Sequence, residues 1–286
     1  GLKEQYRLTE RFLKNRIMTL QIVAPRKSIA GSDMEFVVRL ANTGVGHTFP
    51  AGPEADLIEA WTEVTVRAED GRTLFHYGAL DAKGHLDDRK TYVYRIYPVG
   101  ADGKPLELDR HRTWMFAEDK LHVIPAMQYD ETPFRFKLPL ERRAQRLQIE
   151  ARLRFRKHNQ GFVDWLVGEG NLTVPIVDMA RDSAAVEVIV DAALAREASQ
   201  EWLARLEKPQ GLDGLKMKPR FDGSLIGHKL TLADALVMGR AQQAFKNARY
   251  MDSLSILRTL SPAARRLPHI IRLEKGLEQS AKERAD

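Results

Sequence analysis

The chain has 286 residues, of which 43% are hydrophobic and 29% are charged. Its 45 Lys and Arg residues against 39 Asp and Glu residues give a formal net charge of +6. At about 150 residues per domain, this length predicts two domains, and the composition excludes a collagen-like, disordered or disulfide-stapled chain. The charge excess is modest and belongs to no nucleic-acid-binding module, so we expect no nucleic-acid partner.

The first half of the chain predicts one helix followed by strands. Apolar residues recur at near-helical spacing between Glu4 and Ile17, so we expect an N-terminal helix within residues 1–18. Alternating apolar and polar residues then predict about eight short strands with turn signals between them, which is typical of an antiparallel, immunoglobulin-like (Ig-like) β-sandwich over residues 19–190. The expected strands are Leu20–Ala24, Asp33–Asn42, Leu57–Val66, Thr73–Tyr77, Tyr92–Tyr97, Arg112–Phe116, Phe134–Leu138 and Leu147–Phe155.

Residues 191–286 predict a helical tail. Ala192–Leu206 has a helical pattern, the glycine-rich stretch Gln210–Gly227 predicts a loop, and Thr231–Glu283 is helical again, divided by two prolines. The segment Ala241–Leu254 resembles the centre of a tetratricopeptide (TPR) repeat, and a simple helical hairpin is the alternative. The expected fold class is therefore mainly β with α: a sandwich preceded by a helix and followed by a TPR-like helical segment.

The sequence contains no cysteine, which excludes several kinds of site. Disulfides, thiolate zinc centres, iron–sulfur clusters and cysteine nucleophiles all need a thiol. The CxxCH motif that attaches haem is excluded too, so we expect no covalently bound cofactor. No Walker loop, Rossmann glycine motif, G-x-S-x-G elbow or H-E-x-x-H motif occurs, and we expect that the chain is not an enzyme. No apolar run approaches the roughly 18 residues of a membrane span.

The densest basic stretch is Arg142–Lys157, which coincides with the last expected strand. Its charged positions alternate with apolar ones, as on a strand with one buried face. Two interpretations stay open: a solvated outer face of a sheet, or a docking surface for an acidic partner.

Several motifs follow one another between about residues 17 and 182. Asn42–Pro53 fits the pattern N-x-G-x-G-H-x-F/L-P-T-G, with Ala51 where threonine is usual, and Phe75–Asp87 fits F-x-S-G-x-L-D-x-x-G, with Tyr77 in place of a small residue. Further matching segments are Glu59–Arg72, His111–Trp114, Pro133–Pro139, Ala151–Arg156, Phe162–Trp165 and Val174–Ala180. In order and spacing, these motifs resemble the haem-free β-sandwich that follows the haem-bearing region of certain multihaem c-type cytochromes.

Three histidines are candidates for contact with a haem. His47 lies beyond Gly44 and Gly46 in a loop, from which an imidazole could reach the iron of a partner's haem as an axial ligand. The alternative is a histidine that bonds loop backbone and holds the turn. His85 and His111 lie in loop-like stretches beside acidic residues that could orient an imidazole, and exposed polar loops are the alternative for both. We expect no metal site in the chain itself.

The resemblance implies a haem-free accessory or structural subunit or domain that docks on a multihaem c-type cytochrome in an electron-transfer assembly. His47 would be an axial ligand given in trans, and any haem c would belong to the partner. The resemblance also implies a periplasmic or extracellular bacterial location and a larger assembly. The alternative is an Ig-like module that binds protein or glycan and has no redox role.

Overall fold

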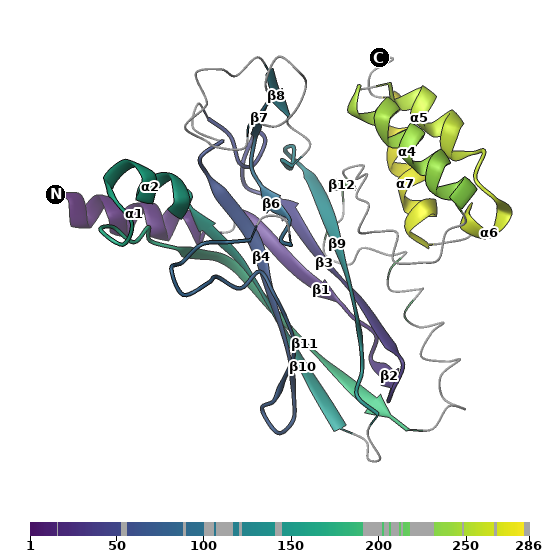
Figure 1. The fold of residues 1–286 in the computed structure, drawn as a ribbon, viewed down its shortest axis with the longest axis horizontal. Helices are drawn as coiled ribbons and strands as arrows, with labels where there is room; N and C mark the ends of the chain where they lie inside the picture. Colours follow the sequence, from purple (N-terminus) through teal and green to yellow (C-terminus); the bar gives the residue numbers. More distant parts are fainter. Residues whose placement is uncertain are drawn as a thin grey trace. The chain divides into compact units, whose positions relative to one another are not determined.

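The computed structural model of the chain describes residues 1–15, 17–52, 56–87, 90–99, 106, 117–119, 122–140, 145–190, 202, 206, 212, 214–217, 232–247, 249–265 and 268–282. The chain divides into two compact units, Gly1–Leu215 and Lys216–Asp286. Strands dominate the first unit and helices the second (Figure 1). The predicted fold class is confirmed, whereas the predicted division at residue 190 stays a prediction because few residues between 191 and 215 are described.

The first unit begins with one helix and then alternates strands with loops. Its elements are α1 (Leu2–Leu13), β1 (Met18–Val23), β2 (Lys27–Ile29), β3 (Asp33–Asn42), β4 (Glu59–Ala68), β5 (Thr73–Tyr77), β6 (Val93–Tyr94), β7 (Tyr97–Val99), β8 (Ala117–Asp119), β9 (Gln128–Lys137), β10 (Gln145–Arg156), α2 (Gln160–Val167) and β11 (Val177–Ile189).

Two sheets face each other in this unit. One carries β1, β3 and β9 in this order, and the other carries β2, β11, β10, β4 and β5, with β6 also paired to β4. The described pairs are antiparallel except that of β2 with β11, which is parallel. Apolar side chains at alternate positions of both sheets are buried in one shared core, as in a sandwich. Phe36 of β3 and Leu153 of β10, for example, are completely buried.

Several elements differ from the sequence prediction. The expected strand Tyr92–Tyr97 is divided into β6 and β7, and β9 begins at Gln128 instead of Phe134. The N-terminal helix ends at Leu13 instead of continuing to residue 18, because Ile17 and Met18 are buried in the sandwich core, where Met18 starts β1. Helix α2 and the 13-residue strand β11 were not expected. The expected strand at Arg112–Phe116 lies outside the described residues.

The outer face of the β1–β3–β9 sheet is covered by a later part of the chain. Trp202 and Leu206 are both helical, and they pack on Val23 and Val37. The buried guanidinium of Arg39 donates 2.8 Å to the carbonyl of Leu206 and is paired with Glu131 at 2.6 Å. These contacts fit the predicted helix at Ala192–Leu206, of which only these two residues are described.

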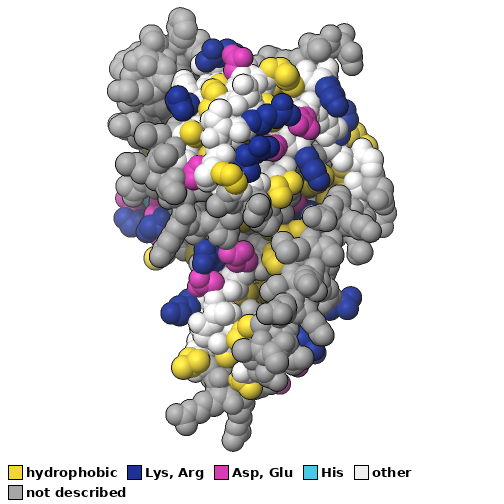
Figure 2. Space-filling model, turned by 90° about the vertical axis from the view of Figure 1, so that its right-hand side faces the viewer, with side chains coloured by type: hydrophobic (Ala, Val, Ile, Leu, Met, Phe, Trp, Pro, Cys, Tyr) yellow, Lys and Arg dark blue, Asp and Glu magenta, His cyan; other side chains and the backbone are white. Residues whose placement is uncertain are grey.

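Two arginines of the basic stretch lie on the outer face of the other sheet, on β10; residues 142–144 of the stretch lie outside the described residues. Arg152 and Arg154 of β10 both donate to Glu63 Oε2 of β4 at 2.9 Å, and both lie within 4 Å of Asp178 of β11. Acidic residues therefore neutralise Arg152 and Arg154, as on a solvated outer face of a sheet, and a docking surface for an acidic partner stays a prediction. Figure 2 presents another side of the molecule, on which Lys and Arg side chains are interspersed with acidic and apolar ones among the described residues.

The second unit contains four described helices and one short strand. They are β12 (Lys216–Met217), α4 (Leu232–Lys246), α5 (Tyr250–Leu257), α6 (Pro262–Arg265) and α7 (Pro268–Lys282). α5 packs on both α4 and α7, and Ser253 Oγ fastens α5 to α4 by donating 2.9 Å to the carbonyl of Ala241. Pro262 and Pro268 each begin a helix and divide this segment as predicted, whereas the break between α4 and α5 lies at no proline and was not predicted. Within the described residues, no helix is long and apolar enough to cross a membrane.

Candidate functional site

Several loops meet at one end of the sandwich, because antiparallel strands begin and end there together. The pairing of Met18 with Asn42 and of Glu59 with Arg156 places the start of β1, the end of β3, the start of β4 and the end of β10 at this end. We call it the His47 end, and it also carries the loop after β3 and the segment with α2. α1 and α2 lie at this end of the strands in Figure 1, and β2 lies at the other.

The loop that contains His47 is fixed to the sandwich by Asn42, the last residue of β3. The amide of Asn42 is completely buried; its Nδ2 donates to the carbonyls of His47 at 2.8 Å and Ile124 at 3.1 Å. Its Oδ1 accepts from the backbone of Val45 at 3.2 Å. Phe49 is buried two residues beyond His47 and exchanges two backbone hydrogen bonds with Ile124. The loop is thus anchored before and after His47.

The side chain of His47 itself is exposed. Its Nδ1 lies 2.8 Å from the carbonyl oxygen of Thr48, which only accepts hydrogen bonds, so Nδ1 carries the proton in the neutral ring. The lone pair is then on Nε2, which has no partner among the described residues. A backbone carbonyl that fixes the tautomer in this way is the arrangement common to metal-ligating histidines. The backbone bond foreseen as the alternative therefore exists and leaves Nε2 free to ligate.

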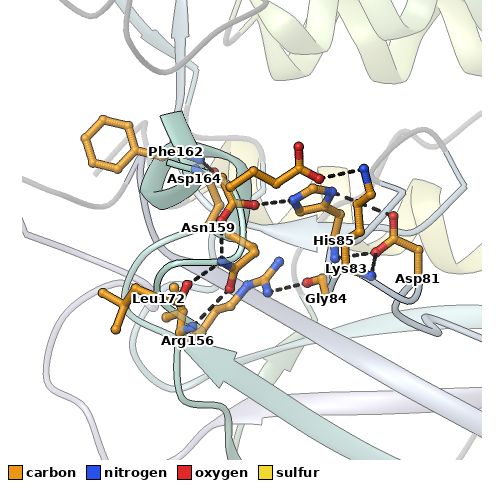
Figure 3. A network of polar contacts seen from close by, with 12 residues as sticks. Asp81, Lys83, Gly84, His85, Arg156, Asn159, Phe162, Asp164 and Leu172 are labelled. Carbon is orange, nitrogen blue, oxygen red and sulfur yellow. Dashed lines mark hydrogen bonds and ion pairs between the residues drawn. The ribbon is translucent and has the colours of Figure 1, made fainter. Parts of the chain in front are cut away.

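His85 lies in the loop between β5 and β6 and is bound differently. Its Nε2 is 2.7 Å from Asp164 Oδ2 of α2, and its Nδ1 is 3.7 Å from Asp81 Oδ2 (Figure 3). Both ring nitrogens thus face carboxylates, and the imidazole joins the loop to α2. Asp81 is one of the acidic residues expected beside His85 in its own loop, whereas Asp164 was not expected, since it lies 79 positions along the chain. His85 as a haem contact stays a prediction.

Two further contacts tie the same loop to the sandwich. Lys83 pairs with Glu169, which follows α2, and the buried guanidinium of Arg156 donates 2.7 Å to the carbonyl of Gly84 (Figure 3). Arg156 is paired with Glu59 in turn. The loop and α2 are therefore held as one piece.

The contacts of this network shift the pKa values of three of its members. The hydrogen bond from His85, followed by that from Gln160, lowers the pKa of Asp164. The backbone N–H of His85 is the main cause that lowers the pKa of Asp81. The ion pair with Glu169 raises the pKa of Lys83. Both carboxylates thus stay ionised to lower pH than usual, as members of a structural network do.

The structure brings two of the three predicted histidines to this region and does not describe the third. His111 lies outside the described residues, as does the H-x-x-W motif to which it belongs. His76 of β5 has a side chain that is 41% exposed and bonds to Glu63 at 2.9 Å. No group of three or more His, Asp or Glu residues that could hold a metal ion occurs among the residues described.

Neither models of protein families nor curated proteins match this chain. Among solved structures, it is similar to a penta-haem cytochrome c552 from Thermochromatium tepidum, with a TM-score of 0.43 and 14% sequence identity. That match covers 62% of this chain and 41% of the cytochrome.

A second likeness is to the CARDB domain of the PF1109 protein from Pyrococcus furiosus. Its solution structure matches with a TM-score of 0.27 and 14% identity over 61% of this chain and 96% of that one. A crystal structure of the same domain in complex with di-metal ions gives a TM-score of 0.26 and 14% identity over 61% of this chain and 87% of that one. All three TM-scores lie below 0.5, so the functional argument rests on the residues of this chain.

Proposed function

We propose that this chain is a haem-free accessory subunit or domain that docks on a multihaem c-type cytochrome, in the periplasm or outside the bacterial cell. The observation that carries the proposal is His47: an exposed imidazole on a doubly anchored loop, with Nδ1 bonded to the Thr48 carbonyl. The sequence motif around this residue resembles the sandwich region of such cytochromes. Because the chain has no cysteine, the haem belongs to the partner.

The residues present fit the role of a ligand given in trans. Haem iron accepts an imidazole nitrogen as an axial ligand, and the exposed Nε2 of His47 is such a nitrogen. The anchoring by Asn42 and Phe49 lowers the conformational entropy that the loop would lose on ligation. The haem supplies the redox chemistry, and this chain supplies a ligand and shields the haem from water. Such shielding shifts a haem's reduction potential, while the sandwich itself carries no electron and catalyses no reaction.

The test is purification of the affinity-tagged chain, under mild conditions, from the organism that naturally makes it. We expect a haem Soret band to accompany the chain in a constant ratio. The substitution His47→Ala should keep the haem in the preparation but convert low-spin bands to high-spin bands, because one axial ligand is lost. His76→Ala is the matched control, since its imidazole is exposed but bonded to Glu63.

Two results would count against the proposal. A colourless preparation would exclude a cytochrome partner and favour the interaction module without a redox role. Unchanged spin-state bands in His47→Ala would remove the ligand role and leave His47 as a residue that shapes the loop.

A further inference from the structure

Helix α2 partly reverses the usual arrangement of a surface helix: it buries Gln160 together with Val163 and exposes large apolar side chains. Gln160 is 3% exposed and the side chain of Asp164 is 10% exposed, so these polar groups face inward. Trp165, Leu166 and Val167 are 53%, 62% and 43% exposed, and Leu172 just beyond the helix is 54% exposed. A helix at a protein surface normally turns its apolar stripe to the core. Residues 165–172 are all exposed, and four of these eight side chains are large and apolar, which marks an interaction surface.

The reversal is enforced by the polar side of the segment. Asn159 caps the helix by accepting from the backbone of Phe162 at 2.6 Å. Gln160 donates to Asp164 and to the carbonyl of Leu172 and accepts from the backbone of Val174, all within 3.0 Å. Figure 3 shows the ring of Phe162 directed away from this network. The apolar side chains are therefore presented by a rigid support, and little order has to be gained when a partner binds.

The segment that carries this surface has few charges. Between Gln160 and Ile176 the only ionisable side chains are Asp164 and Glu169; Glu169 is paired with Lys83, and Asp164 is hydrogen-bonded to His85. A surface of low charge is complementary to an apolar partner surface. A haem edge offers such a surface, since the porphyrin macrocycle is apolar.

We infer that Trp165, Leu166, Val167 and Leu172, which we call the α2 patch, form the apolar contact with the haem-bearing partner. The inference rests on the proposed function and adds a second contact to it. The α2 patch and His47 belong to the same end of the sandwich, so one partner surface can meet both. The α2 patch then supplies binding affinity for the partner, and His47 supplies the bond to the haem iron.

The experiment compares variants of the tagged chain purified from the organism that makes it. The double substitution Trp165→Ser and Leu166→Ser should lower the haem-to-chain ratio at least tenfold, because buried aromatic and leucine anchors dominate such interfaces. Leu140→Ser is the matched control: Leu140 is 85% exposed and lies beyond the end of β9, away from the His47 end. The control should keep the wild-type ratio. Circular dichroism of each variant checks that the fold is retained.

The outcomes separate this inference from the proposed function. A coloured wild type whose haem ratio is unchanged in the double variant would overturn the inference and leave the cytochrome partner in place. A colourless wild type would overturn both. A wild type that forms a dimer by light scattering, and loses the dimer instead of the haem in the double variant, would identify a second copy as the occupant and overturn the inference as well.

Discussion

Two loops at the same end of the sandwich each carry a histidine, and they use it in opposite ways. The loop after β3 is anchored by Asn42 and Phe49, and among the described residues the exposed ring of His47 bonds its own loop backbone alone, through Nδ1. The loop after β5 is anchored through its histidine, because His85 Nε2 bonds to Asp164 of α2. A loop whose anchors are other residues can present its histidine to a partner. A candidate ligand is therefore distinguished from a structural histidine by whether other residues fix its loop to the sandwich.

The largest expected effect concerns Gly78, which begins the His85 loop. Its φ of +73° is in the left-handed region, and a Cβ there would meet the Thr62 carbonyl oxygen at 2.7 Å and Trp61 Cδ1 at 3.0 Å. The substitution Gly78→Ala should lower the free energy of unfolding by more than about 3 kcal/mol, since backbone of β4 must move. Urea denaturation followed by tryptophan fluorescence measures this, because every tryptophan lies in the first unit.

Gly84 is the matched control within the same loop. Its φ is +81°, but nothing lies within 4 Å of an added Cβ, so Gly84→Ala should cost only about 1 kcal/mol for the left-handed conformation. Equal losses of unfolding free energy in Gly78→Ala and Gly84→Ala would show that Gly78 is not needed for the close approach of this loop to β4.

The second effect concerns the anchor of the His47 loop. Asn42→Ala removes three hydrogen bonds made by a completely buried amide, which should cost about 2–3 kcal/mol. The Ile124 carbonyl keeps its bond from the Phe49 backbone, whereas the bonds to the His47 carbonyl and from the Val45 backbone are lost without replacement. His47→Ala, in the same loop, should change the free energy of unfolding by less than about 0.5 kcal/mol, because the side chain is exposed. The same urea titration compares the two. A loss in His47→Ala as large as that in Asn42→Ala would assign His47 a structural role.

Much of the sandwich could be predicted because several of its strands have apolar residues at every second position. The limits of β3 and β5 match the predicted Asp33–Asn42 and Thr73–Tyr77, and β4 and β10 are within two residues of their predicted limits. Strand β11 was missed because its middle, Arg181–Ala185, contains alanine, serine and charged residues of low β-propensity. Its pairing with the full length of β10 overrides that local preference. Long-range pairing of this kind leaves no signal in the strand's own sequence.

The candidate site was predictable only in part, for a related reason. His47 was found from its motif, and the role of Asn42 in the same motif became visible only from its contacts with Ile124, 82 positions away. Helix α2 was missed because Gly161 and its aromatic and β-branched residues are poor helix formers. The signal that could have found it is Asn159, a strong N-cap residue directly before it. The partner of His85 lies on that missed helix, so this contact could not be predicted either.

A third, smaller effect is the acid stability of the His85 network. The pKa of Asp164 is lower in the folded state than in the unfolded chain. Its ionisation therefore stabilises the fold, and this contribution is complete above the pKa of the unfolded chain, near 4. The contribution is lost as the pH falls through the pKa of the folded state. His85→Ala should raise the pKa of Asp164 toward its ordinary value and reduce the loss of stability below pH 4. Carboxyl ¹³C NMR titration measures the pKa values of Asp164 and Asp81 in the wild type and in His85→Ala.

Asp81 is the internal control for that titration. Its pKa is lowered first by the backbone N–H of His85, which the alanine variant retains, so it should move less than that of Asp164. Equal shifts of the two carboxylates would mean that His85 acts through its charge alone and not through the hydrogen bond to Asp164.

The smallest effect is a change of tautomer rather than of stability. In the neutral ring of His47, the Thr48 carbonyl accepts the Nδ1 proton, so Nε2 should be the unprotonated nitrogen. Long-range ¹H–¹⁵N NMR at a pH where the ring is neutral separates the two nitrogens by their chemical shifts. Free histidine favours the opposite tautomer, with the proton on Nε2, so the backbone bond has to shift that balance. A protonated Nε2 in the free chain would mean that the ring must change tautomer before it could bind iron, and the pre-organisation of His47 as a ligand would be lost.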